Sequence, residues 1–136
     1  MTVMTYLFLD GRTEEALDFY KKAVGADVTM LMKFKESPDK SQIPPGADDK
    51  VMHAVFRVGD TPIMISDGMN NGRPKFEGFA LSVNANDVAE AQKYFNALLD
   101  GGEVTMPLAE TFFAKSFGML KDKFGVHWMV IAPKPM

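Results

Sequence analysis

The chain has 136 residues and a formal net charge of −3, with 46% hydrophobic and 24% charged residues. These values are those of a folded globular protein and exclude a disordered chain, and the acidic balance argues against a nucleic-acid partner. The absence of cysteine excludes disulfides, thiolate metal sites and cysteine nucleophiles. No stretch reaches the roughly 18 apolar residues of a membrane span, and no basic residue precedes the apolar start as in a signal peptide. We therefore expect a cytoplasmic protein with no membrane partner.

The first half of the chain predicts one helix among four strands. The expected elements are a strand over 3–9, a helix from 13 to 25, a strand over 27–34, and a hairpin of strands over 50–58 and 61–66. The hydroxyl of Thr13 is the predicted cap of the helix, and Gly25 its predicted end. The prolines and charges of residues 36–49 predict a long loop, whose length is typical of a lid or an interface arm.

The second half predicts the same kinds of element in the same order. The expected elements are a loop over 67–78, a strand over 79–83, a helix over 88–99, and strands over 103–106, 115–121 and 126–132. Asn86 and Asp87 are the predicted cap of this helix, and the glycines at 101 and 102 its predicted end.

The two halves are an internal repeat. EEALDFYKKAVGADVTM in the first half matches AEAQKYFNALLDGGEVTM in the second, and Met64 then corresponds to Met129. The order βαβββ followed by βαβββ predicts an α+β fold in which paired repeats form an eight-stranded half-open barrel with the helices outside. We expect one domain over 1–136, made of modules over about 1–67 and 78–136, with a cleft lined by the inner strand faces.

Strand alternation selects the residues that face this cleft. Along residues 51–58 the even positions are all apolar and should pack under a helix, whereas the odd positions include His53 and Arg57. His53 is therefore a candidate site residue, or a hydrogen-bonded and inert histidine on a wetter face. Met64 and Met129 are a soft wall of the cleft or ordinary core methionines.

An aromatic pair precedes the seventh predicted strand. Phe112 and Phe113 lie between Glu110 and Lys115, a combination that borders a ligand site or serves as a hydrophobic staple under a loop.

Motifs for other chemistry are missing. The two histidines are not at a metal-ligand spacing, and no glycine-rich turn follows a strand as nucleotide or S-adenosylmethionine sites require.

The chain resembles the PhnB-like branch of the vicinal oxygen chelate superfamily. The segments that carry the resemblance are YLFLDG, EEALDFYKKAVGA, MHAVFRVGDTPIMISD and ETFFAKSFGMLKDKFGVHWMVI, and together they cover nearly the whole chain. That superfamily includes glyoxalase I, extradiol dioxygenases, and fosfomycin- and bleomycin-resistance proteins, and members of the branch are often called 3-demethylubiquinone methyltransferases. The resemblance implies a homodimer. The chain departs from the branch at Phe113-Ala114, where Trp-Gly is common.

The resemblance also locates the metal ligands of the superfamily's metalloenzymes. They correspond to positions near Thr5, Met64, Ala80 and Met129, none of which is a competent ligand for a divalent ion. We therefore expect no metal and no other cofactor. If a divalent metal binds, it does so through residues outside this register, with His53 and Glu110 as candidates.

Two functions follow, from different classes. The first is binding of a small, partly apolar molecule in a metal-free cleft, as bleomycin-resistance-like proteins do by sequestration. The residues expected to bind the ligand are Thr5, His53, Met64, Ser66, Phe113, Lys115 and Met129. The alternative is a lyase- or oxygenase-type enzyme in which His53 is the acid, base or metal ligand, helped by Arg57 or Lys115. A scaffold role has only the loop over 36–49 in its favour.

Overall fold

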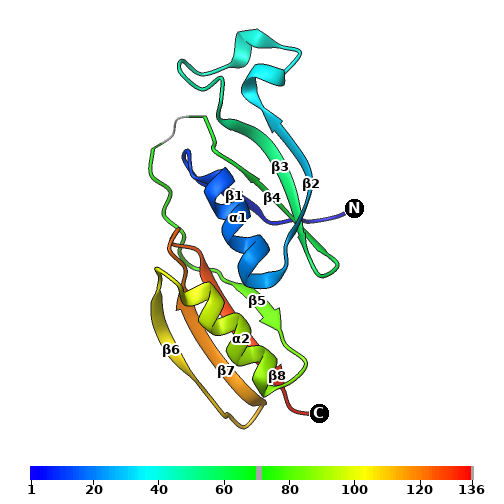
Figure 1. Ribbon diagram of the computed structural model, residues 1–136, viewed down its shortest axis with the longest axis vertical. Helices are drawn as coiled ribbons and strands as arrows, with labels where there is room; N and C mark the ends of the chain where they lie inside the picture. The colour runs from blue at the N-terminus through cyan, green and yellow to red at the C-terminus, as the bar shows by residue number, and fades with distance from the viewer. Residues whose placement is uncertain (70–71, 136) are drawn as a thin grey trace. The chain divides into compact units, whose positions relative to one another are not determined.

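The computed structural model describes residues 1–69 and 72–135, and its chain forms two compact units. Unit 1 is Met1–Pro74 and unit 2 is Lys75–Met136. The division falls inside the predicted loop over 67–78, of which Asn70 and Asn71 lie outside the described residues. Each unit contains one helix and one open four-stranded sheet, so the predicted α+β class and the βαβββ repeat are confirmed (Figure 1).

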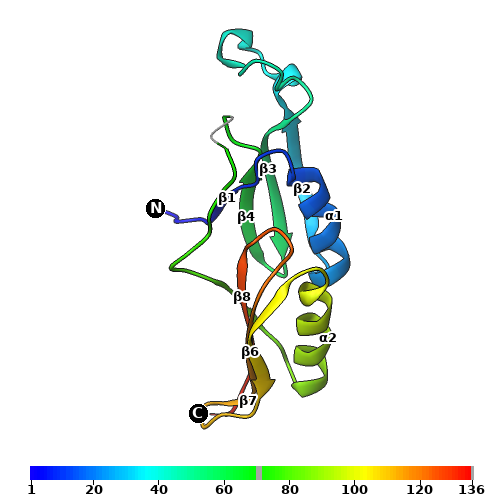
Figure 2. The ribbon, with the colours of Figure 1, turned by 90° about the vertical axis from the view of Figure 1, so that its left-hand side faces the viewer.

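Unit 1 is built on sheet 1, whose strand order is β1-β4-β3-β2. Its elements are β1 (Tyr6–Phe8), α1 (Thr13–Val24), β2 (Asp27–Lys33), β3 (Val51–Val58) and β4 (Thr61–Ser66). Helix α1 covers one face of the sheet, and we call the other face the open face (Figure 2). Phe56 of β3 stacks on Tyr20 of α1 with ring centroids 5.5 Å apart, and both are fully buried. Of the even positions of β3 predicted to pack under the helix, Ala54 and Phe56 are fully buried, whereas Met52 and Val58 toward the strand ends are half-buried.

The long connection between β2 and β3 belongs to unit 1. It contains two short 3-10 turns, Phe34–Glu36 and Lys40–Gln42, and extends past the ends of the two strands (Figure 1). Its ends are fastened by backbone hydrogen bonds from Phe34 to Lys50 and from Lys35 to Asp48, each 3.0 Å long. The predicted loop over 36–49 is thus an arm with a paired base.

Unit 2 repeats this plan on sheet 2, with the order β5-β8-β7-β6. Its elements are β5 (Leu81–Asn84), α2 (Val88–Leu99), β6 (Glu103–Ala109), β7 (Ala114–Lys121) and β8 (His127–Pro133). Helix α2 covers one face, and the other is the open face of sheet 2 (Figure 2). Trp128 and Val130 of β8 are buried on the helix side, whereas Met129 between them is half-buried on the open face.

The two helices begin in different ways. Asp87 caps α2 by accepting a hydrogen bond from the backbone N–H of Glu90 at 2.8 Å, as predicted. The predicted hydroxyl cap of α1 is wrong, because Thr13 is already the first helical residue and its buried Oγ1 has no partner among the described residues. Instead, Asp67 Oδ1 accepts from the N–H groups of Gly11 and Thr13 at 2.9 and 3.0 Å. In the described part of the chain, neither helix is long and apolar enough to cross a membrane.

Each sheet has an edge strand with a bulge at the same place in the repeat. The extra residue is Thr29 in β2 and Thr105 in β6. Because a bulge shifts the alternation by one residue, the methionine that follows it, Met30 or Met106, comes to lie on the open face. The two sheets therefore share their irregularity as well as their strand order.

Candidate functional site

The open face of sheet 1 is a grid of paired side chains. Its first row is Met30, Val55, Met64 and Tyr6, each paired with the next across the sheet. In the second row Met32 pairs with His53, and Ser66 pairs with Phe8. The face is mostly apolar, with its polar groups gathered where β1, β4 and β3 run side by side.

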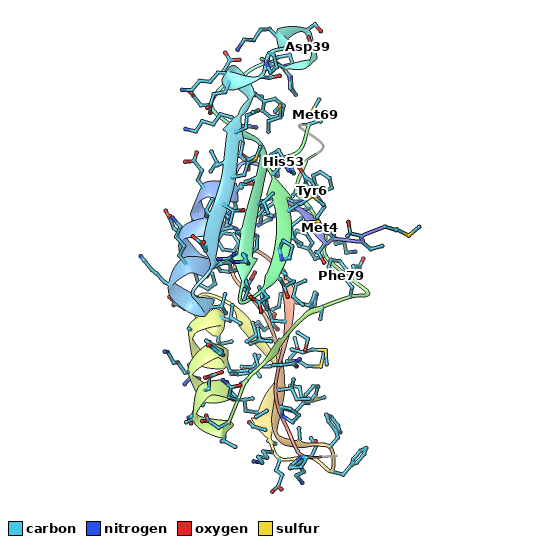
Figure 3. All side chains as sticks on the ribbon, turned by 90° about the vertical axis from the view of Figure 1, so that its right-hand side faces the viewer. Met4, Tyr6, Asp39, His53, Met69 and Phe79 are labelled. Atoms are coloured by element: carbon cyan, nitrogen blue, oxygen red, sulfur yellow. The ribbon has the colours of Figure 1, made fainter. Side chains whose placement is uncertain are left out.

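Tyr6 and His53 are joined by a hydrogen bond on this face. The Tyr6 hydroxyl lies 2.9 Å from Nδ1 of His53, and the two ring centroids are 5.5 Å apart (Figure 3). Phe8 stacks on the Tyr6 ring at 4.7 Å. The hydrogen bond engages one imidazole nitrogen and leaves Nε2 without a partner among the described residues. In either tautomer, Nε2 offers one oriented hydrogen-bonding position to a bound molecule.

Four of the predicted site residues belong to unit 1. His53 and Met64 lie on the open face, and Ser66 is buried, with its Oγ accepting a hydrogen bond from the N–H of Gly68 at 3.1 Å. Thr5 precedes β1, and its backbone oxygen accepts from the N–H of Met64 at 2.9 Å. Thr5 is thus linked to Met64 through the backbone.

The other three predicted site residues belong to unit 2. Phe113 lies between two aromatic rings, with centroid distances of 5.1 Å to Phe112 and 5.2 Å to Phe117. Lys115 is exposed at an irregular position of β7, and Met129 pairs with Met119 on the open face of sheet 2. Within unit 2, Phe113 therefore belongs to an aromatic cluster, and Met129 to a separate set of methionines.

Sequence reasoning did not select Tyr6 as a site residue. The signal was available in the alternation of β1, where Leu7 is fully buried and its neighbours Tyr6 and Phe8 are not. The position of Tyr6 opposite Met64, already a candidate, also required only the correct strand pairing. The contact with His53 depends on this register across β4.

Two further ionisable groups considered from the sequence are held in ion pairs. Glu110 lies 2.9 Å from Nζ of Lys134, and the hydrogen bond and positive charge of that lysine lower the pKa of Glu110. Arg57 lies 3.3 Å from Asp27 across the edge of sheet 1. Each of these two groups is thus paired with a residue of its own unit.

The residues at which the resemblance places the superfamily's metal ligands are not typical ligands of a divalent ion. Thr5, Met64, Ala80 and Met129 offer one hydroxyl, two thioethers and a methyl group, whereas such ions prefer imidazole and carboxylate ligands. Among the described residues, no group of three or more His, Asp or Glu side chains is placed to hold a metal ion.

Comparison with known proteins identifies the family. The family model described as 3-demethylubiquinone-9 3-methyltransferase matches residues 1–131. The chain belongs to this family. The crystal structure of PA1353 from Pseudomonas aeruginosa is 38% identical, with a TM-score of 0.87 and 99% of each chain covered. A PhnB protein from Bacillus cereus is 28% identical, with a TM-score of 0.82, and the comparison covers 97% of this chain and 99% of that one.

A more distant structure extends the likeness to the fold. The glyoxylase/bleomycin resistance protein/dioxygenase domain from Frankia is 14% identical, has a TM-score of 0.66, and is matched over 98% of both chains. The family model and the Bacillus cereus PhnB protein confirm the predicted resemblance to the PhnB-like branch, and the Frankia domain shows the shared fold. This member of the 3-demethylubiquinone-9 3-methyltransferase family thus contains the two βαβββ modules that the sequence repeat predicted.

The family description names a methyl transfer, which needs a methyl donor. Donors and nucleotides are commonly held by free backbone N–H groups at a strand-to-helix turn. In the turn between β1 and α1, the N–H groups of Gly11 and Thr13 already donate to the buried carboxylate of Asp67. This turn therefore does not fit such a cofactor.

Proposed function

We propose that the chain binds a small, partly apolar molecule on the open face of sheet 1, without a divalent metal. The observation that carries this proposal is the hydrogen bond between Tyr6 and His53 on a face otherwise formed mainly by methionine, valine and phenylalanine. Small-molecule sites combine apolar walls with a few oriented polar groups. Met32 and Met64 supply adaptable walls, and Nε2 of His53 supplies the oriented group.

The charges around this face favour an uncharged ligand. Arg57 is neutralised by Asp27 at the sheet edge, and Lys33 lies 3.6 Å from Glu14 of α1. Each of these two cations is thus paired with an acid, which reduces the positive charge that could attract an anion. A neutral molecule with one hydrogen-bonding group suits the pair and leaves the thioethers to contact its apolar part.

We also propose that the chain is cytoplasmic and forms a homodimer, of which the homodimer is implied by the resemblance. Phe79 and Phe112, outside the proposed small-molecule site, are 49% and 92% exposed in the single chain. Covering such side chains with a second copy would remove apolar area from water. Sedimentation equilibrium should then give twice the monomer mass, and a purely monomeric protein would contradict this part of the proposal.

The binding proposal is tested with two probes that differ by one hydroxyl, 1-naphthol and naphthalene. We expect 1-naphthol to bind roughly threefold to tenfold more tightly, because one net hydrogen bond contributes about 0.5–1.5 kcal/mol. His53→Ala should remove this difference while naphthalene still binds, as measured by fluorescence titration. Met69→Leu, at an exposed methionine outside both rows of the grid, is the matched control. Equal affinities of both probes for the unsubstituted protein would contradict the role of His53.

The same hydrogen bond favours one alternative, acid–base catalysis by His53. A histidine whose Nδ1 is held by a tyrosine presents Nε2 in a fixed direction, as a general acid or base requires. In lyase- and oxygenase-type assays, His53→Ala would then lower turnover by about 10²- to 10⁴-fold while probe binding is kept. If binding and turnover fall together, or no turnover is found, the binding function stands alone.

A further inference from the structure

Unit 2 carries three methionines in one row across its sheet. Met106 of β6 pairs with Met119 of β7, and Met119 pairs with Met129 of β8. Met106 is 45% exposed, and the other two are half-buried. Directly paired residues of antiparallel strands have Cβ atoms about 4.5–5.5 Å apart. Since a methionine side chain is long and has three rotatable bonds, the three sulfurs of this row can meet over its centre.

The bulge in β6 completes the row. If β6 had no bulge, the regular register after Val104 would place Thr105, and not Met106, opposite Met119. Unit 1 has the same bulge and the same row, but Val55 stands in the middle, between Met30 and Met64. The protein thus contains a three-thioether row and, at the matched position, a row that lacks the central thioether.

We propose that the methionine row of unit 2 binds a soft monovalent metal ion of the Cu(I) class. Thioethers are soft ligands that select such ions over divalent ions such as Mg²⁺ or Mn²⁺. The chain has no cysteine, so no thiolate competes with the methionines for the metal. His127 lies two residues before Met129 on the same strand, and its imidazole is a candidate for the fourth ligand. All residues of this site belong to unit 2, whereas the proposed small-molecule site is built from residues of unit 1.

The test uses Ag(I) as a probe, because it has the charge and softness of Cu(I) and needs no reductant. Calorimetric titration of the full chain in chloride-free buffer should show one tightly bound Ag(I) per chain. In spectra of protein with ¹³C-labelled methionine methyl groups, the signals of Met106, Met119 and Met129 should shift together. Met119→Val copies the unit 1 row and should weaken binding by at least about tenfold, since even the loss of a second-shell partner of a metal site costs that much.

Two further variants make the test specific. Val55→Met should add a second equivalent of bound Ag(I), because it restores the missing thioether in unit 1. Met69→Leu, outside both rows, should leave the titration unchanged. If Met119→Val does not fold, Met106→Leu at the exposed end of the row takes its place. Unsaturable Ag(I) binding, or unchanged affinity in the row variant, would overturn the proposal.

Discussion

The same βαβββ scaffold carries different chemistry in the two units. The matched open-face positions, set by equivalent strand pairings, are Val55 and Met119, His53 and Phe117, and Tyr6 and Ser82. Unit 1 thus has a hydrogen-bonded pair of ionisable side chains where unit 2 has only a phenyl ring and a small hydroxyl. Since strand order, pairing and edge bulge are shared, the difference arises from single side chains on a constant backbone.

The units also use a buried carboxylate in different places. Asp67 in unit 1 accepts hydrogen bonds from the start of α1 and from the N–H of Val51. Asp122 in unit 2 follows β7 and accepts from the N–H groups of Phe124 and Val126 and from the indole of Trp128 at 2.8 Å. Asp67 joins segments that are far apart in the sequence, whereas Asp122 fastens the turn between β7 and β8, and each carboxylate is a structural tie of its own unit.

Removing either of these two carboxylates should give the largest loss of stability. Asp67→Ala and Asp122→Ala each leave three backbone or indole N–H groups without their acceptor, and we expect a loss of about 3–5 kcal/mol in the free energy of unfolding. Urea unfolding measures this, with the fluorescence of the single tryptophan, Trp128, as a reporter of unit 2. If Asp67→Ala moves the tryptophan transition as far as Asp122→Ala does, the two units unfold together, and a smaller shift means that they unfold separately.

A smaller loss of stability is expected from substitutions at the matched positions Ala54 and Gly118 beneath the helices. A Cβ at Gly118 would lie 2.9 Å from the ring of Phe95 and 3.1 Å from the backbone of Leu108. Gly118→Ala should therefore destabilise the protein by about 1–3 kcal/mol through overpacking. The reciprocal change, Ala54→Gly, should cost only about 0.5–1 kcal/mol. Thermal unfolding compares the two, and a neutral Gly118→Ala would mean that α2 can shift to accept the methyl group.

The smallest change in stability is expected from substitutions in the arm between β2 and β3, which has no counterpart in unit 2. Lys35 and Asp49 form an exposed pair at 2.9 Å, and their hydrogen bond raises the pKa of Lys35 and lowers that of Asp49. Any stabilisation from the pair is therefore lost as pH falls through the lowered pKa of Asp49, and again as pH rises through the raised pKa of Lys35. Asp49→Asn should leave unfolding unchanged, because exposed pairs contribute little.

The same variant has a local readout. In Asp49→Asn, NMR titration of Lys35 should show its pKa moving back toward the ordinary lysine value. Asp60→Asn, in the turn between β3 and β4, is the control and should leave the Lys35 titration unchanged. A large change in overall stability would show that the arm is part of the core of unit 1.

Local signals in the sequence predicted the helices and most of the strands. Gly25 ends α1 with a left-handed backbone (φ 67°), and Asp87 caps α2, because both effects act within a few residues. The cap of α1 was misassigned to Thr13, because the true acceptor, Asp67, is 54 residues away. Alternation selected the open-face positions of His53 and Met64.

The contacts of the candidate site were beyond the sequence. The hydrogen bond between Tyr6 and His53 spans 47 residues and crosses an intervening strand, so it follows only from the observed register. The row of Met106, Met119 and Met129 was equally hidden, since it depends on a one-residue bulge that hydrophobic alternation does not reveal. Residue types suggested where a site could be, and the pairing of strands decided which side chains meet.

The edge bulges also affect how copies of this protein meet one another. A flat, regular edge strand offers unpaired N–H and C=O groups as a template for another chain. Here the outer strands are either very short, as β1 and β5 are with three and four residues, or irregular, as β2 and β6 are. Pro107 within β6 removes one more backbone donor. Edge-to-edge pairing of sheets into fibres is thereby discouraged, and copies of the chain are left to associate through the broad faces of their sheets.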